Sequence, residues 1–339
     1  MKRILMLLLS LLMASVALSD GAGPMEETVL DLSELAGLPT HYRLYDRDFF
    51  ESPDEHAGTV VKIKYKNDLY EKPFTNYISV YLPCGYDENG TERYPVIYFL
   101  HGNGGDSTTL LGNEATVNAF DHMISSGVVR PFILVAPSYY YDQRHKLSDM
   151  DIFIRELREE LMPMIEGQYR TYAETPDEEG FRASRGYRAF CGFSWGSMNT
   201  FAMFDSMLDV GRYFLPFAGA LRNVEGDPVD LDTLRGAIDR EKKDYFLYMA
   251  CGGEEDTAFE GCRNLAQTLA QDTEYFDYGP DFQENRFFYC QSDNIHQDLC
   301  TRYYARFQND LEGSQMVCGH IRFSIKDPLR IFVKISISL

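Results

Sequence analysis

Six runs of the sequence are almost continuously apolar, and they limit the fold of this chain more than any other feature. The runs are residues 95–102, 132–138, 188–194, 214–220, 245–251 and 286–291. A strand with one face in water alternates apolar and polar residues, whereas a strand covered on both faces is apolar throughout. The runs therefore predict an α/β fold whose mostly parallel sheet has helices on both faces.

The segments around these runs complete the pattern. Two earlier segments, 58–66 and 76–83, alternate apolar and polar residues, which predicts an antiparallel hairpin at one edge of the sheet. Helical periodicity covers residues 151–169, 257–271 and 298–311, and Pro163 should strain the first of these helices near its end. Neither an internal repeat nor a Pro/Gly/Ser linker interrupts residues 58–311, so we expect one domain there. The acidic stretch 171–186 is interpreted as a surface loop.

The two ends of the chain differ from this domain. Residues 1–19 combine Lys2 and Arg3 with a short apolar core and small residues near Ser19, which is typical of a secretory signal peptide. A membrane anchor is the alternative, but no positive stop-transfer flank follows. We therefore expect a secreted protein, extracellular or periplasmic, with no membrane contact once the signal is removed. Residues 20–57 form an N-terminal segment, and 312–339 are a basic tail of unknown role.

Charge and cysteine content exclude some classes of function. The formal net charge is −20, which argues against nucleic acid as a partner because phosphate binding requires a basic face. The seven cysteines show no CxxC pair and no metal-ligand spacing, so we expect no metal and no cofactor. Cys191, Cys251 and Cys290 fall in apolar runs and should be small buried residues. A Cys262–Cys300 bridge is an open alternative, and the sequence does not indicate an oligomeric state.

The run "RAFCGFSWGSMNT" (188–200) contains the motif G-x-S-x-G around Ser194. In this motif the serine occupies a sharp turn between a strand and a helix, and glycines flank it because a Cβ would crowd the turn. Here an apolar run precedes Ser194 and a helical stretch follows, as the motif requires. A tight turn with a surface serine is the alternative. The pattern predicts that Ser194 is a catalytic nucleophile.

A serine nucleophile needs a base and an acid that orients the base. In this architecture they follow the serine in the order acid, then histidine, each after a strand. His296 follows the last apolar run by five residues, whereas His320 lies in the tail, so His296 is the predicted base. The loop "GGEEDTAF" offers Glu254, Glu255 and Asp256, among which spacing alone does not choose. We favour Asp256 because it directly precedes a helix, although a helix N-cap would explain it equally well.

The glycine-rich loop "FLHGNGGDS" (99–107) should supply part of an oxyanion hole. We expect the backbone N–H groups of Asn103 and Trp195 to be its two donors, with His101 supporting the loop rather than reacting. A phosphate-binding loop is excluded because no GK[ST] follows. Tyr139 and Tyr140, with Tyr141, come after the run 132–138 and could stack on an acyl group or a sugar, although packing within the loop is the alternative.

Several stretches together resemble a known family. They are "VYLPCGYDENGTERYPVIYFLHGNGGD", "LMPMIEGQYRT", "YRAFCGFSWGSMNTF", "LDVGRYFLPFAGAL", "YFLYMACGGEEDTAFEG" and "DNIHQDLCTRYYARF". Over about residues 58–311 the chain resembles the xylanase-associated feruloyl esterases of carbohydrate esterase family 1, within the enterochelin-esterase-like group. The resemblance implies an eight-stranded α/β-hydrolase fold without a large lid. It also implies Ser194 as nucleophile, Asp256 as acid and His296 as base.

The chain departs from that family beside the reaction centre. Trp195 and Ser197 replace a common Met and Gly after the serine, and Gln297 stands where a Trp often follows the histidine. Trp195 and Gln297 fall where the acyl group or the sugar would lie, so the resemblance makes them candidate substrate contacts. The implied function is hydrolysis of feruloyl or acetyl esters on a polysaccharide or oligosaccharide such as xylan. Alternatives are an acyltransferase, a hydrolase of peptide or siderophore esters, and a non-catalytic carbohydrate-binding relative.

Overall fold

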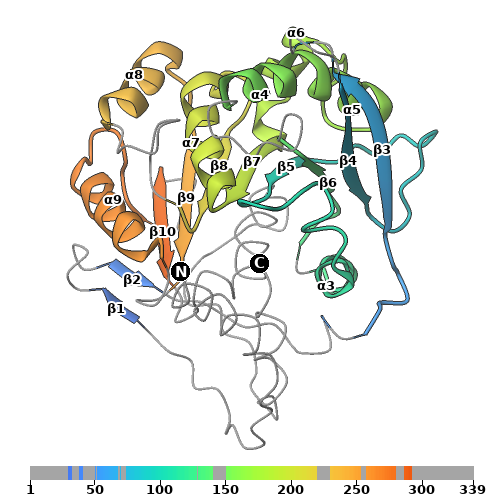
Figure 1. The fold of residues 1–339 in the computed structure, drawn as a ribbon, viewed down its shortest axis with the longest axis horizontal. Coiled ribbons are helices and arrows are strands. Elements are labelled where there is room, and N and C mark those ends of the chain that lie inside the picture. Colours follow the sequence, from blue (N-terminus) through green and yellow to red (C-terminus); the bar gives the residue numbers. More distant parts are fainter. Residues whose placement is uncertain are drawn as a thin grey trace, which may run out of the picture.

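The computed structural model of the chain describes an eight-stranded sheet with helices on both faces (Figure 1). The described residues are 30–32, 38–40, 50, 52–67, 69, 74–127, 129–139, 150–219, 230–252, 257–279 and 286–291. The strands are β3 (Thr59–Asn67), β4 (Phe74–Leu82), β5 (Val96–Leu100), β6 (Ile133–Pro137), β7 (Arg188–Phe193), β8 (Tyr213–Phe217), β9 (Phe246–Cys251) and β10 (Phe287–Gln291). Two short strands, β1 (Leu30–Leu32) and β2 (Leu38–Thr40), form a separate antiparallel pair.

The strand order across the sheet is β10-β9-β8-β7-β5-β6-β4-β3. Strands β5 to β10 run parallel, and β3 and β4 form an antiparallel hairpin at one edge. The predicted α/β-hydrolase sheet and its edge hairpin are therefore confirmed. Because the carboxyl ends of the six parallel strands point the same way, the loops that follow these strands meet at one end of the sheet. Ser194 lies at that end.

Helices cover both faces of the sheet (Figure 1). They are α3 (Glu114–Ser125), α4 (Met150–Glu156), α5 (Met162–Gln168), α6 (Glu178–Ala183), α7 (Trp195–Met207), α8 (Asp232–Glu241) and α9 (Phe259–Gln271). In Figure 1, α4, α7 and α8 lie along one side of the sheet and α3 lies on the other. Helix α7 packs on β5, β7 and β8, so the helix that follows Ser194 lies on the central strands.

The predicted helix 151–169 is present but not uniform. A π-helical turn, Leu157–Leu161, separates α4 from α5, and the N–H of Met162 bonds to the carbonyl of Leu157, five residues back. Pro163 lacks an N–H, and in an α-helix its ring would meet the carbonyl four residues back. The wider turn just before Pro163 removes that conflict, so the helix continues to Gln168.

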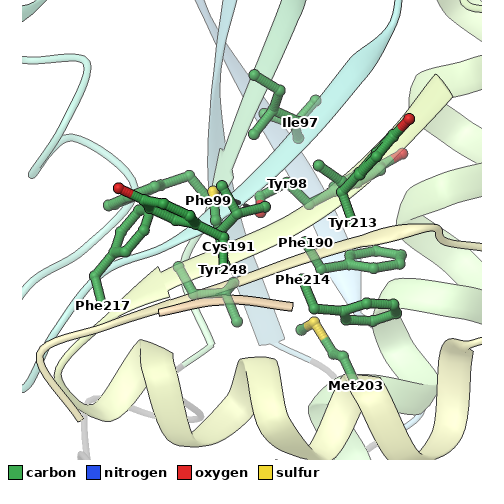
Figure 2. Packing of buried hydrophobic residues seen from close by; sticks show 14 of the residues in the cluster. Ile97, Tyr98, Phe99, Phe190, Cys191, Met203, Tyr213, Phe214, Phe217 and Tyr248 are labelled. Atoms are coloured by element: carbon green, nitrogen blue, oxygen red, sulfur yellow. Dashed lines mark hydrogen bonds between the residues drawn. The ribbon is translucent and has the colours of Figure 1, made fainter. Parts of the chain in front are cut away.

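Aromatic side chains pack on both faces of the central strands (Figure 2). Phe190 of β7 and Phe214 of β8 lie with ring centroids 5.7 Å apart, and Met203 of α7 packs beside them. On the opposite face, Phe217 meets Tyr248 edge-on at 6.2 Å. Burial of one such side chain stabilises the fold by about 1.5–3 kcal/mol. The strand that ends at Ser194 is therefore buried on both faces.

The other end of β7 carries a buried ion pair. Arg188 donates to both carboxylate oxygens of Glu166 at 2.7 and 2.6 Å, and both side chains are almost completely buried. Arg188 also donates to the Phe181 carbonyl at 2.9 Å, and Tyr98 donates to Glu166 at 3.0 Å. Although burial alone would lower the pKa of Arg188, the Glu166 carboxylate raises it, so the guanidinium stays charged.

One expectation requires correction, and one open alternative is decided. The stretch 171–186 is not only a loop, because it contains α6, whose N-cap Asp177 accepts a hydrogen bond from Gly180 N at 2.9 Å. Cys262 is a buried free thiol, so it forms no bridge with Cys300. Cys191 and Cys251 are buried as expected, and burial raises the pKa of the Cys191 thiol well above its usual value.

Some expectations lie outside the described residues. These are the signal peptide 1–19, the helix 298–311, the tail 312–339 and the side chain of Cys290. Within the ranges that the structure does describe, no helix has both the length and the apolar character to cross a bilayer.

Candidate active site

Ser194 has a strained backbone at the junction of β7 and α7. Its φ is 56° and its ψ is −113°, and it is one of three non-glycine residues with positive φ in the described part of the chain. Such a conformation costs about 1–3 kcal/mol and persists only where the surroundings fix it. The sharp turn predicted from G-x-S-x-G is therefore present. It places Ser194 at the carboxyl-terminal end of the parallel strands.

The two motif glycines allow this turn because backbone atoms approach them closely. A Cβ on Gly192 would lie 2.3 Å from the carbonyl oxygen of Gly196, so β7 and α7 could not meet. A Cβ on Gly196 would lie 2.3 Å from the carbonyl oxygen of Leu100 and 2.7 Å from that of His101. The start of α7 thus lies directly against the end of β5.

The turn after β8 supports the same serine. The Ser194 N–H donates to the carbonyl of Phe217 at 2.8 Å, and the buried Ser197 hydroxyl donates to the carbonyl of Gly219 at 3.0 Å. Ala218 between them also has positive φ, 49°, and its N–H bonds to Ala250 of β9 at 2.7 Å. Sequence reasoning noted Ser197 only as a departure from the family pattern, and it assigned this turn no role.

The predicted oxyanion loop lies beside Ser194. A Cβ on Gly102 would lie 3.2 Å from the Ser194 Cβ. The loop turns directly afterwards, because Gly105 N donates to the Gly102 carbonyl at 3.1 Å and Gly104 takes φ +77°. Asn103, which is exposed, occupies this turn next to the serine. The structure therefore brings together the two segments that the sequence analysis paired.

Asp106 stabilises the far side of this loop. Its carboxylate accepts from Thr108 N at 2.7 Å and from the Thr108 hydroxyl at 2.6 Å. Burial alone would raise the pKa of Asp106, but these hydrogen bonds and the charges of His101 and Lys62 lower it. The carboxylate is thus ionised at neutral pH, and the loop keeps its acceptor.

Trp195, the second predicted donor, is the first residue of α7. The first N–H groups of a helix have no acceptor within the helix, and they carry its positive end. The N–H of Trp195 is therefore suited to an anion beside Ser194. Its side chain is half-buried at the start of α7, beside Ser194.

Tyr139 does not face a ligand. It is only 3% exposed, its ring stacks on the His101 imidazole with centroids 4.4 Å apart, and its hydroxyl donates to the His101 carbonyl at 2.8 Å. Of the two possibilities stated for Tyr139, the packing alternative describes its contacts, because the side chain packs inward against the predicted oxyanion loop. The fold could not be read closely enough from the sequence to show this contact.

Four predicted site residues lie outside the described residues: Tyr140, Asp256, His296 and Gln297. The strands that precede them are described. Asp256 follows β9 and His296 follows β10, and both strands run parallel to β7. Across the described residues, no cluster of three His, Cys, Asp or Glu side chains is placed to hold a metal ion.

Comparison with known proteins bears on this site. The Esterase family model matches residues 75–203, a stretch that includes both the oxyanion loop and Ser194. Over these residues the chain is similar to this esterase family. The xylanase-associated esterase resemblance seen in the sequence is thus confirmed at the level of family and fold.

The names of two curated relatives include the word xylanase. The esterase chain is 30% identical to endo-1,4-beta-xylanase Y of Acetivibrio thermocellus over 246 residues, 71% of this chain and 22% of that protein. It is 29% identical to an endo-1,4-beta-xylanase/feruloyl esterase of Xylanibacter ruminicola over 164 residues, 46% of this chain and 21% of that one. The chain thus spans about a fifth of the length of either relative.

A solved structure is similar over more of its length. It is a serine-to-alanine mutant of the feruloyl esterase module from Clostridium thermocellum, complexed with sinapinate. The identity is 26%, the TM-score is 0.67, and the match covers 86% of this esterase and all of that module.

Proposed function

We propose that this esterase is a secreted serine hydrolase that removes feruloyl or related acyl groups from xylan. The observation that carries the proposal is the strained Ser194, at φ 56°, with the glycine-rich loop of β5 against its Cβ. That arrangement suits attack on a carbonyl carbon beside two backbone donors. A triad with Asp256 and His296 is part of the proposal, and the parallel β9 and β10 support it because the segments after them start at the same edge.

The reaction follows two-step acyl transfer. His296 accepts the Ser194 proton as the hydroxyl oxygen attacks the ester carbonyl, and Asp256 orients the imidazole. The N–H groups of Asn103 and Trp195 stabilise the negative oxygen of the tetrahedral intermediate. His296 then protonates the leaving sugar oxygen, and water attacks the acyl-enzyme in the second step to release the acid and restore Ser194.

The names of the similar proteins indicate which acyl group the enzyme would remove. One similar structure contains sinapinate, a methoxylated hydroxycinnamate, and one relative is named as both xylanase and feruloyl esterase. These names support a hydroxycinnamoyl ester of xylan as substrate, with an acetyl ester as the competing choice. Around Ser194, Trp195 and the segments that contain Tyr140 and Gln297 would then contact the acyl group or the sugar.

The first test is hydrolysis of a short-chain nitrophenyl ester by the full chain. Ser194→Ala and His296→Ala should each lose almost all activity, because residues of a triad act as a unit. Ser206→Ala is a matched control, since Ser206 lies on the same helix but is exposed. Wild-type rates in Ser194→Ala would refute the proposal.

The second test compares methyl ferulate with acetylated xylan. A higher kcat/KM on the ferulate supports the hydroxycinnamoyl substrate, and a higher value on the acetylated polymer replaces it with an acetyl ester. Product analysis with a sugar acceptor present separates transfer from hydrolysis. N-terminal sequencing of secreted protein should begin at residue 20 if the signal peptide is cleaved as proposed.

A further inference from the structure

The peptide between Gly102 and Asn103 is oriented by groups on its carbonyl side. A peptide unit is planar and trans, so its N–H and its C=O point in opposite directions. The carbonyl of Gly102 lies 2.8 Å from His101 Nδ1 and 3.1 Å from the N–H of Gly105. Whatever fixes that carbonyl therefore also fixes the direction of the Asn103 N–H, the expected oxyanion donor.

This contact determines that Nδ1 of the His101 imidazole carries a proton. A carbonyl oxygen only accepts, so Nδ1 of His101 must carry the proton and donate. The ring lies close over the loop, because a Cβ on Gly105 would stand 2.9 Å from the His101 Cβ and 3.0 Å from Nδ1. His101 is 2% exposed, which keeps water from competing for the carbonyl.

Tyr139, two residues after the end of the neighbouring strand β6, in turn holds His101 in place. Its ring stacks almost parallel on the imidazole, at an interplanar angle of 13°, and its hydroxyl donates to the His101 carbonyl at 2.8 Å. Phe153 of α4 also packs edge-on against the tyrosine, with ring centroids 5.8 Å apart. The tyrosine thus contacts both the side chain and the backbone of the residue that orients the oxyanion peptide.

We propose that Tyr139 is a positioning residue for catalysis, which sets the direction of the Asn103 N–H by stacking on His101 and bonding to its carbonyl. This inference rests on the proposed function, because an oxyanion must form for the direction of that N–H to matter. Tyr139 touches no reacting atom in this scheme. Its loss should slow the chemical step and leave ground-state binding of the ester nearly unchanged.

The test is Tyr139→Phe, which keeps the stacked ring and removes only the hydroxyl. Loss of a whole oxyanion donor lowers turnover about 10²–10³-fold. A misdirected donor should reduce turnover less than the loss of a donor does. We therefore expect kcat on a nitrophenyl ester to fall about tenfold, with KM within about twofold of the wild-type value. Inhibition by an alkyl boronic acid, whose serine adduct is tetrahedral and anionic, should weaken by a similar factor.

The matched control is Tyr245→Phe. Tyr245 is also buried and also donates to a backbone carbonyl, that of Tyr275, but it lies beside the start of β9, at the opposite end of the strands from Ser194. This variant should match Tyr139→Phe in any loss of stability while keeping the wild-type kcat. Equal falls in kcat for the two variants would show a merely structural role and overturn the inference.

A second pair of variants tests the step through His101. His101→Phe keeps a flat ring without the Nδ1 donor, whereas the amide of His101→Asn can donate from nearly the same position. We expect His101→Asn to retain more kcat than His101→Phe, and the reverse order would overturn the inference. If wild-type activity does not depend on Ser194, the proposed function fails instead, so the two failures are distinguishable.

Discussion

Replacement of Gly196 by alanine is the sharpest test of how the site is built. The added Cβ would lie 2.3 Å from the Leu100 carbonyl oxygen and 2.7 Å from that of His101. Both are backbone atoms, so no side chain can rotate away. Ordinary contact begins at 3.4 Å, so the start of α7 and the end of β5 must separate by about 1 Å.

That separation has a predictable effect on catalysis. The end of β5 leads into the loop with Asn103, and α7 begins at the nucleophile, so the two halves of the oxyanion hole would move apart. A displacement of about 1 Å at a reaction centre costs about 10²-fold in rate. We therefore expect kcat/KM of Gly196→Ala to fall at least about 10²-fold, with a loss of stability of about 1–3 kcal/mol from overpacking.

The assay compares nitrophenyl ester hydrolysis and thermal unfolding with those of Gly236→Ala. A Cβ on Gly236, in α8, meets no atom within 4 Å. That alanine should raise stability by about 0.5–1 kcal/mol and leave activity unchanged, because glycine weakens a helix interior. A Gly196→Ala protein that is folded, by circular dichroism, and hydrolyses ester at the wild-type rate would refute this account of the turn.

Three further changes test the framework around the site. Glu166→Gln leaves the buried Arg188 guanidinium without its carboxylate, so it should lower the free energy of unfolding by about 3–5 kcal/mol in urea titrations. Glu159→Gln, in an exposed ion pair, should lower it by less than about 0.5 kcal/mol. Equal losses for the two variants would contradict the stabilising role of the buried pair. Asn113→Ala should cost about 1 kcal/mol because the Asn113 side chain accepts from the second N–H of α3, and Asn113→Asp should restore most of it. Burial alone would raise the pKa of Asp209, but Arg158 lowers it below its usual 3.8. That contribution to stability is present above pH 3.8 and is lost as pH falls through the lowered pKa, so melting midpoints of Arg158→Gln and wild type should differ above pH 3.8 and converge only as the pH falls below it.

The sheet could be predicted from sequence because its signal is local. Each central strand is a short, mostly apolar run, because burial on both faces leaves few polar positions to obscure it. The motif around Ser194 is local too, since two glycines and a serine define the turn by steric requirement alone. The turn at Ser194 and the glycine-rich loop beside it were therefore both predictable from the sequence.

The remaining features are not local in this sense. Helix α6 was interpreted as loop because "TPDEEG" is rich in residues typical of turns, yet Asp177 is an N-cap and two glutamates occupy the first turn, which is itself a helix-start pattern. Helix α8 was not expected at all, because few of its residues are buried. The inward packing of Tyr139 depends on a contact across two strands, which no pattern within either strand indicates.

The strand order explains why the site lies at the centre of the sheet. In the strand order β8-β7-β5-β6, the two inner strands lead into the parts to which we assign the chemistry: β7 ends at Ser194, the proposed nucleophile, and β5 leads into the proposed oxyanion loop. Each outer strand supports its inner neighbour, since the turn after β8 bonds to Ser194 and Tyr139 after β6 bonds to His101. A nucleophile or an oxyanion loop at a sheet edge would have support from one side only. The strained serine and the fixed peptide therefore both depend on strands that themselves take no part in the chemistry.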